Sequence, residues 1–148
     1  MIRLADGRFL IFSEGRRLAD GTTEVLLFDG DPALAGTKAV RLGYRAPEDF
    51  RITDAAQLPD GRLLFLNRRI SLLAGIQAKL TIAEAPKLKE GAILAGRELA
   101  HFQPPVTTDN YEAMSIETEN GRPVVWIASD DNFMGFQRTL MLKFALAE

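Results

Sequence analysis

Two short polar segments in the C-terminal third of the chain carry the residue types that could do chemistry. Ser129-Asp130-Asp131-Asn132-Phe133 follows an apolar, β-branched stretch, and Asn110-Tyr111-Glu112 lies just upstream. Carboxylate and amide oxygens grouped at a loop are the ligands that a hard cation such as calcium needs. The same residue types also build Asx turns, in which side chains cap their own backbone. The two segments by themselves leave both interpretations open.

The size and composition of the chain limit what these segments could serve. The chain has 148 residues, enough for one domain with a real core. Its 18 basic and 20 acidic residues, without a basic run, argue against nucleic acid as a partner. Cysteine is absent, which excludes disulfides, thiolate zinc sites and a cysteine nucleophile.

The sequence also predicts no membrane span and no export signal. No window approaches the roughly 20 apolar residues that cross a bilayer. The first seven residues lack the basic start and the apolar run of a signal peptide. The residues alone therefore leave the localisation undetermined.

A repeat indicates the architecture that positions the polar segments. Residues 4–12 match residues 58–66, and more loosely residues 119–127. Each copy is a tight Asp-Gly or Asn-Gly turn followed by an apolar run, which is a strong hairpin signal. Gly7, Gly61 and Gly121 are separated by about 54 and then about 60 residues, near the upper end of known propeller repeats.

Further strands keep the same phase relative to these glycines. Second strands are expected at 25–28, 80–83 and 140–144, outer strands at 39–42 and 98–102, and inner strands at 54–58 and 112–116. Four strands per unit make the blade of a β-propeller. We therefore predict an all-β, β-propeller-like domain of about three four-stranded blades, with units at approximately 1–45, 46–105 and 106–148. The segment 85–96 is expected to be a polar loop between strands.

The strand count predicts that the ring is incomplete. The first unit is expected to lack an inner strand and the last unit an outer strand. About three blades cannot close a ring, since propellers have four to eight. Either an N-terminal half is missing, or two copies form a homodimeric ring of about six blades.

Several segments carry a resemblance to a known family. They are residues 6–14, 53–64, 110–112 and 129–133, followed by Gln137-Arg138-Thr139. In this order the segments resemble the C-terminal part of the bacterial family described as esterase-like activity of phytase. The resemblance implies a β-propeller, an ester hydrolase, and a periplasmic or secreted location.

Two positions depart from the pattern of that family. After Asn-x-Glu the family usually has glycine, and this chain has Ala113. Where the second-blade strand of the family tends to end in Leu-Glu-Arg, this chain has Leu66-Asn67-Arg68. The first departure removes backbone freedom, and the second removes a carboxylate.

Blade geometry predicts where the polar residues meet. The loop that enters an inner strand and the loop that joins the second and third strands lie on one face of a propeller. Asp49, Asp54, Asn110 and Glu112 fall in loops of the first kind. Glu14, Asn67, Arg68 and the run 130–132 fall in loops of the second kind. All of them should converge at one mouth of the channel.

Clustered carboxylates repel one another unless a cation offsets their charge, so a divalent ion, with calcium preferred, is the expected cofactor. The expected metal ligands are Glu14, Asp54, Asn110, Glu112, Asp130, Asp131 and Asn132. Arg68 and Tyr111 are expected to contact the ligand. Glu112, Asp130 and Arg138 are the candidate catalytic residues.

Geometry and resemblance together predict metal-assisted hydrolysis of phosphate or other esters, because arginine holds anionic oxygens bidentately. The alternative is a non-catalytic propeller that binds an anionic ligand or a protein partner. Structural roles also remain open: an ion pair between Glu112 and Arg138, an Asx turn at Asp130, and packing by Tyr111. The single histidine, His101, falls in an outer strand, so a Ser-His-Asp triad has little support.

Overall fold

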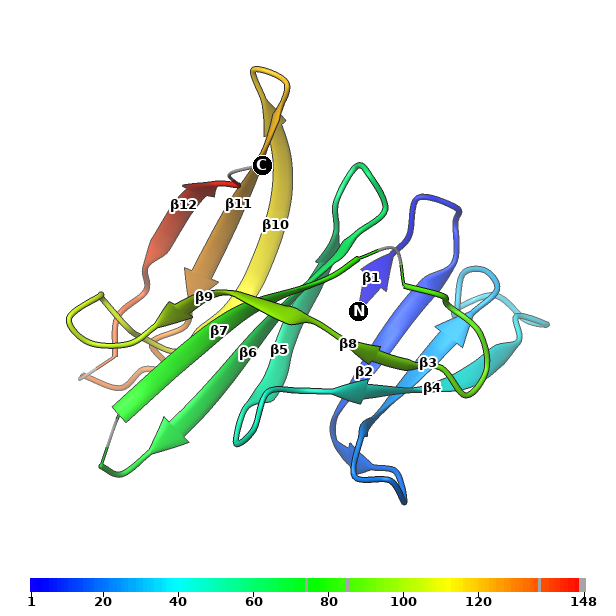
Figure 1. The fold of residues 1–148 in the computed structure, drawn as a ribbon, viewed down its shortest axis with the longest axis horizontal. Helices are drawn as coiled ribbons and strands as arrows, with labels where there is room; N and C mark the ends of the chain where they lie inside the picture. The colour runs from blue at the N-terminus through cyan, green and yellow to red at the C-terminus, as the bar shows by residue number, and fades with distance from the viewer. Residues whose placement is uncertain (74, 85, 136, 147–148) are drawn as a thin grey trace.

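The computed structural model describes residues 1–73, 75–84, 86–135 and 137–146. These residues form twelve strands in three twisted sheets that stand side by side (Figure 1). The described residues contain no helix, and therefore none long and apolar enough to cross a membrane. The all-β, partial propeller-like fold predicted from the sequence is confirmed.

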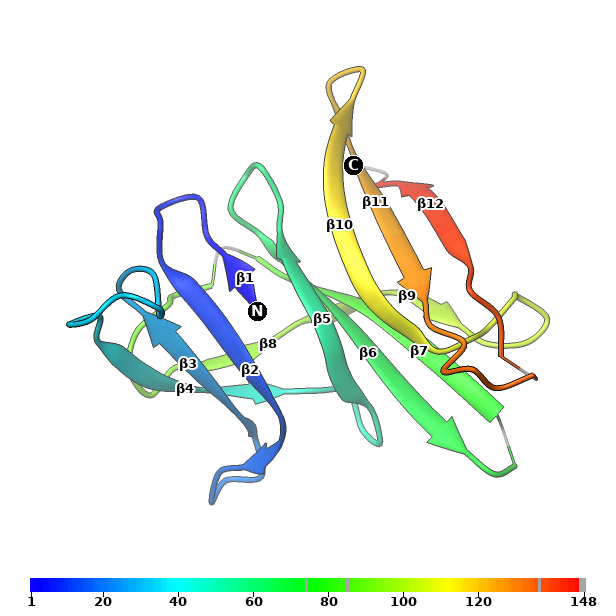
Figure 2. The same cartoon turned by 180° about the vertical axis from the view of Figure 1, so that it is seen from behind.

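The first sheet has the order β1-β2-β3-β4-β8. Its strands are β1 (Ile2–Arg3), β2 (Phe9–Arg17), β3 (Thr23–Phe28), β4 (Ala39–Arg45) and β8 (Ile93–Ala95). The second sheet consists of β5 (Arg51–Gln57), β6 (Leu63–Ser71), β7 (Gly75–Ala83) and β9 (Arg97–Phe102). The third consists of β10 (Tyr111–Glu119), β11 (Arg122–Ser129) and β12 (Met141–Ala145). Seen from behind in Figure 2, the second sheet again lies between the other two.

The repeated turns have the same geometry in the first two sheets. Gly7 donates its backbone N–H to the carbonyl of Leu4 at 3.0 Å, and Gly61 donates to Leu58 at 2.9 Å. The two glycines have φ angles of 88° and 91°, which side chains other than glycine rarely adopt. The third turn has positive φ at both Asn120 and Gly121, as a two-residue hairpin turn requires.

Two sequence predictions need correction. The first sheet does have an inner strand, since β1 pairs with β2 through Ile2 and Arg3. The segment 85–96 is not only a loop, because β8 lies in it and pairs in parallel with β4. A three-residue strand whose partner lies about fifty residues away leaves no periodic signal in the sequence. Ala85, at the start of that segment, lies outside the described residues.

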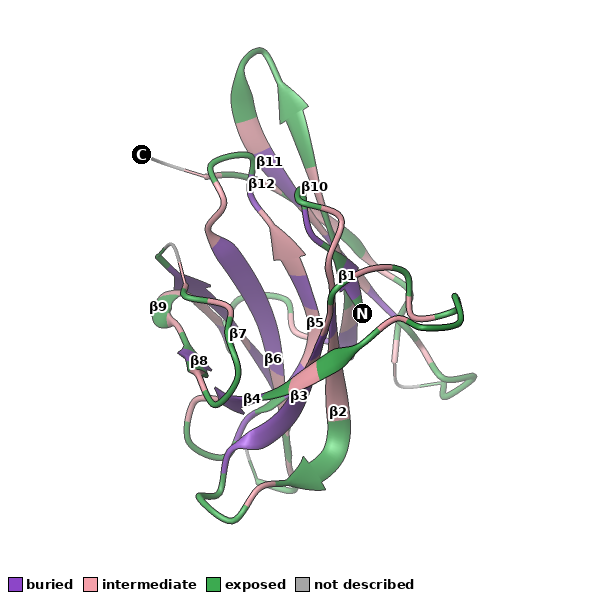
Figure 3. Ribbon diagram, turned by 90° about the vertical axis from the view of Figure 1, so that its right-hand side faces the viewer, coloured by how far each residue is buried: buried purple, intermediate pink, exposed green. Residues whose placement is uncertain are grey.

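Two apolar cores join the three sheets, and β6 contributes to both. Leu63 and Phe65 pack into the core between the first and second sheets. Leu64 and Leu66 pack into the core between the second and third sheets. This alternation is the two-residue period of a strand buried on both faces. Figure 3 shows the buried strands in the middle of the molecule, with exposed hairpin tips around them.

The two outer sheets each turn one face away from the middle sheet. Phe9, Ile11, Leu26 and Phe28 are only half-buried, and they alternate along β2 and β3 with residues of the first core. The third sheet has three strands within the described residues. Coverage of these faces by an N-terminal half or by a second copy stays a prediction.

Candidate functional site

A register shift interrupts the pairing of a long strand in each sheet, and the second sheet has a further one in the β7–β9 pair. The shifts lie between Phe12 and Arg17 in β2, between Ile52 and Asp54 in β5, and between Tyr111 and Ala113 in β10. Such irregularities bend a strand and re-aim a side chain, and they are frequent beside active sites. Glu14, Thr53 and Glu112 are residues that these shifts leave without a partner in the ladder.

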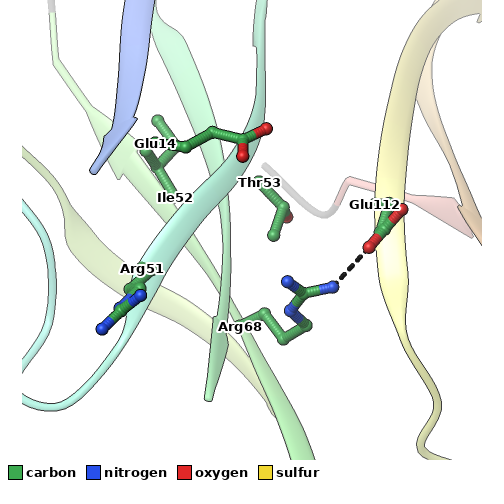
Figure 4. A pocket seen from close by; sticks show the side chains of 6 residues that line it. All are labelled: Glu14, Arg51, Ile52, Thr53, Arg68 and Glu112. Carbon is green, nitrogen blue, oxygen red and sulfur yellow. Dashed lines mark hydrogen bonds and ion pairs between the residues drawn. The ribbon is translucent and has the colours of Figure 1, made fainter. Parts of the chain in front are cut away.

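These three side chains line one pocket (Figure 4). Its other lining residues are Arg51, Ile52 and Arg68, and its volume is about 220 Å³. The pocket therefore takes residues from all three sheets, as the predicted mouth does. Five residues that were predicted to lie in loops lie within strands, because the hydrogen-bonded strands extend beyond their buried apolar residues: Glu14, Asp54, Asn67, Arg68 and Glu112. We call this space the ester pocket, after the ester hydrolysis that the sequence predicts.

Arg68 and Glu112 are held to each other across the second and third sheets. The Arg68 guanidinium donates from Nη1 to the Glu112 carboxylate and to the side-chain oxygen of Asn110. Asn110 in turn donates from Nδ2 to Glu112 at 2.8 Å and to the carbonyl of Asp130 at 3.2 Å. Three predicted site residues thus form one hydrogen-bonded unit that fixes the guanidinium at the pocket wall.

Glu14 and Arg51 differ from that unit because they are not engaged. Within the described part of the chain, neither the Glu14 carboxylate nor the Arg51 guanidinium has a hydrogen-bond or ion-pair partner. Figure 4 shows the Glu14 carboxylate directed toward Thr53, with Arg68 on the far side of that residue. The pocket therefore holds two different groups. One is a carboxylate that is free to accept a proton, and the other is a guanidinium that is fixed in place.

Asp54 lies beside the pocket and has a structural task. Its Oδ2 accepts the backbone N–H of Met114 at 2.7 Å, and its Oδ1 accepts that of Ala55 at 2.8 Å. The register shift in β10 ends one residue before Met114. Asp54 thus joins the second sheet to the third.

Arg138 contacts a different carboxylate from the one predicted. It donates its backbone N–H and its Nε to Oδ2 of Asp109 at 3.1 and 3.4 Å, rather than pairing with Glu112. Asp109 is buried, with only 3% of its surface exposed, and its Oδ1 accepts the backbone N–H of Asn110. The sequence reasoning missed Asp109 because nothing in its local pattern marks it as buried.

The run 130–132 forms the Asx turn that was the alternative to a ligand role. Asp130 accepts the backbone N–H of Asn132 at 3.0 Å, and Asp131 accepts that of Phe133 at 2.9 Å. Asp131 also accepts the Thr139 hydroxyl, and Asn132 donates from Nδ2 to Gln137. None of these residues lines the ester pocket.

Tyr111 is a core residue. It is fully buried, its ring meets that of Phe102 edge to face, and its hydroxyl donates to the carbonyl of Thr107 at 2.8 Å. Burial, together with the charge of Asp109, raises the pKa of the Tyr111 hydroxyl. The expectation that Tyr111 contacts a ligand finds no support in this placement. His101 is also away from the pocket, packed edge-on against Phe50 in the second sheet.

Both departures from the family pattern have a local explanation. Asn67 points away from the ester pocket into the first core, where it is fully buried and its Oδ1 accepts the Tyr44 hydroxyl at 2.7 Å. A neutral amide suits that buried position better than a carboxylate would. Ala113 is not among the residues with positive φ, so its position in β10 does not require glycine.

The described acidic residues do not fit the expected calcium site. They contain no group of three or more carboxylate, histidine or cysteine side chains arranged to hold a metal ion. The carboxylates of Asp54, Asp131 and Glu112 already accept hydrogen bonds from the protein. A calcium ion needs six to eight oxygens, and these residues do not offer them together.

Arg51 and Thr53 are pocket residues that the sequence reasoning did not select. Thr53 enters the pocket through the register shift in β5, and Arg51 is the residue opposite Arg68 in the β5–β6 ladder. The only available signal was the segment 53–64 itself, which begins at Thr53. Strand register cannot be read from a single apolar run.

A family model described as "Phytase-like: Esterase-like activity of phytase" matches residues 1–133. The matched range includes every lining residue of the ester pocket. No curated protein and no solved structure matches the chain.

Proposed function

Because the chain belongs to the phytase-like family, described as having the esterase-like activity of phytase, we propose that the ester pocket hydrolyses esters. One observation carries this proposal: the carboxylate of Glu14, which has no partner among the described residues, faces the fixed guanidinium of Arg68 across Thr53. A base and a fixed cation in one pocket are the two groups that ester hydrolysis needs. The family supports a hydrolase in general, and the assignment of the step to these residues is ours.

In the proposed step Glu14 acts as the general base. It takes a proton from a water molecule as the water oxygen attacks the carbonyl carbon or the phosphorus of the ester. The bond from that atom to the alcohol oxygen breaks, and the alcohol leaves with the proton that Glu14 returns. The products are one acid and one alcohol, so the atoms of the ester and the water balance.

Arg68 stabilises the negative charge that develops on the ester oxygens. A fixed cation favours a transition state more than a mobile one, because it needs no reorganisation during the reaction. Glu112 and Asn110 act as positioning residues, since both accept hydrogen bonds from the Arg68 guanidinium. Asp130 and Arg138 have no part in this step.

The divalent cation expected from the sequence stays a prediction. No step above depends on it, because the described carboxylates do not form a ligand set. A calcium titration followed by thermal unfolding tests it, since a ligand that binds the folded state raises Tm. A rise in Tm that disappears in Glu14→Gln would place calcium in the ester pocket.

A second candidate function has one observation in its favour. Arg68 already has a carboxylate and an amide as partners, as in a purely structural ion pair. This favours the alternative in which the pocket binds an anionic ligand or a protein partner without turnover. Ligand binding without any hydrolysis would select this alternative.

The experiment for hydrolysis uses two chromogenic esters, 4-nitrophenyl acetate and 4-nitrophenyl phosphate. We expect turnover of at least one of them, and Glu14→Gln should lower kcat by about 100-fold or more, the usual contribution of a general base. Glu117→Gln is the matched control, because Glu117 is an exposed carboxylate further along β10. Equal rates in both variants, or no turnover by the native protein, would contradict the proposal.

A further inference from the structure

A second, smaller pocket adjoins the ester pocket and shares Glu14, Arg51 and Ile52 with it. Its remaining lining residues are Gly15, Arg17 and Thr23. We propose that this small pocket is a subsite for an oxyanion, namely a charged group of the ester whose scissile bond lies in the ester pocket. The identity of the ligand as an ester rests on the proposed function, whereas the affinity for an oxyanion does not.

The charges in the small pocket are unbalanced. Arg17 donates from Nη1 to the carbonyl of Gly21 at 3.0 Å, and no carboxylate of the described residues pairs with it. Arg51 has no partner among the described residues, and Glu14 forms an ion pair with neither arginine. The lining side chains thus carry two positive charges and one negative charge. A bound oxyanion offsets the excess and accepts charge-assisted hydrogen bonds from both guanidinium groups.

This arrangement is unusual for the arginines of this chain. Most of the others contact a carboxylate within the described residues. They are Arg8, Arg16, Arg41, Arg62, Arg68, Arg69, Arg97 and Arg138. Three more lack such a contact, and they lie apart on β1, β4 and β11: Arg3, Arg45 and Arg122. Arg3 and Arg122 each line a separate pocket, whereas Arg17 and Arg51 are two arginines without a carboxylate partner that line the same pocket of the described structure.

The volume of the small pocket limits the size of the group that it takes. It measures about 70 Å³, compared with about 220 Å³ for the ester pocket. About 10–15 Å³ of such volume holds one water molecule, so the small pocket takes a group the size of a few water molecules, such as one carboxylate or one phosphoryl group. The substrate class is therefore an ester that carries a charged group only a few bonds from the bond that breaks.

Binding of simple oxyanions tests the subsite without any chemistry. Inorganic phosphate and acetate, each titrated by calorimetry, represent the two forms of the group. We expect at least one of them to bind, and Arg17→Gln and Arg51→Gln to weaken that binding by about tenfold or more, as loss of a charged hydrogen bond does. Arg122→Gln is the matched control, because Arg122 also lacks a carboxylate partner within the described residues. Absence of binding, or equal weakening in the control, would overturn the subsite.

Kinetics separate this inference from the proposed function. The native protein should prefer mono-4-nitrophenyl succinate, which is charged, over neutral 4-nitrophenyl butyrate. Arg17→Gln should lower the ratio of their kcat/KM values by about tenfold, mainly through KM of the charged ester. If esters are hydrolysed with the same ratio in both proteins, the subsite fails and the hydrolase stands. If no ester is hydrolysed but oxyanion binding is lost in Arg17→Gln, the hydrolase fails and the subsite stands.

Discussion

The ester pocket and the cluster around Asp109 both place carboxylates beside arginines. They differ because the pocket includes a carboxylate, Glu14, that has no hydrogen-bond partner among the described residues. Around Asp109 both carboxylate oxygens accept hydrogen bonds from backbone or side-chain groups. In the pocket, Glu14 and Arg51 have no partner among the described residues. A buried polar group must be satisfied for the fold to be stable, whereas a reacting group must remain available. We therefore expect changes at Asp109 to affect stability and changes at Glu14 to affect activity.

The strongest challenge to this comparison is to remove the Asp109 carboxylate. Asp109→Ala leaves the backbone N–H groups of Asn110 and Arg138 without an acceptor, which should lower the free energy of unfolding by about 3 kcal/mol. Denaturant unfolding measures this loss. Glu14→Gln is the control and should unfold like the native protein, because it breaks no contact within the described residues. A larger loss in Glu14→Gln than in Asp109→Ala would reverse the roles of the two regions.

A second prediction applies the same rule to a buried group in the first core, Tyr44. Burial raises the pKa of Tyr44 to about 12, although hydrogen bonds with Thr81 and Asn67 lower it. A raised pKa in the folded state means that the neutral hydroxyl contributes stability below pH 10, and that this contribution is lost as the pH rises from about 10 to about 12. Two pKa units correspond to about 2.7 kcal/mol, which is an upper limit here.

The measurement for Tyr44 is the free energy of unfolding as a function of pH. Tyr44→Phe should remove most of the decrease above pH 10, while costing about 1 kcal/mol at neutral pH because Asn67 loses its donor. A decrease above pH 10 that is the same in Tyr44→Phe would show that another group controls alkaline unfolding.

The smallest effect is expected at the exposed Asx turn. Asp131→Ala removes one bond to the Phe133 N–H and one to the Thr139 hydroxyl, at positions where water replaces both. We expect a loss of less than about 1 kcal/mol of stability and no change in kcat. Hydrolysis and denaturant unfolding, measured on the same sample, check both parts. A fall in kcat of tenfold or more would bring this turn back into the functional site.

The sequence predicted the convergence of the site better than the roles within it. Glu14, Arg68 and Glu112 do meet at one pocket, because the later parts of β2 and β6 lie on the same face as the start of β10. Asp54 was expected to bind a metal, and it instead accepts the Met114 N–H of the next sheet. Arg51 and Thr53 were not selected, since their place depends on a register shift in β5. Local pattern reports which residues are polar, and not which polar groups already have partners.

By itself the sequence determined the all-β, propeller-like fold, since Asp-Gly turns and phase-locked apolar runs are local signals that need no distant partner. The pairing of β8 with β4 and the burial of Asp109 were decided only in the tertiary structure. So was the difference between Asp54, which joins two sheets, and Glu14, which has no partner among the described residues. Each of these depends on which strands lie next to one another, and the free energy of a charged group is set by those neighbours.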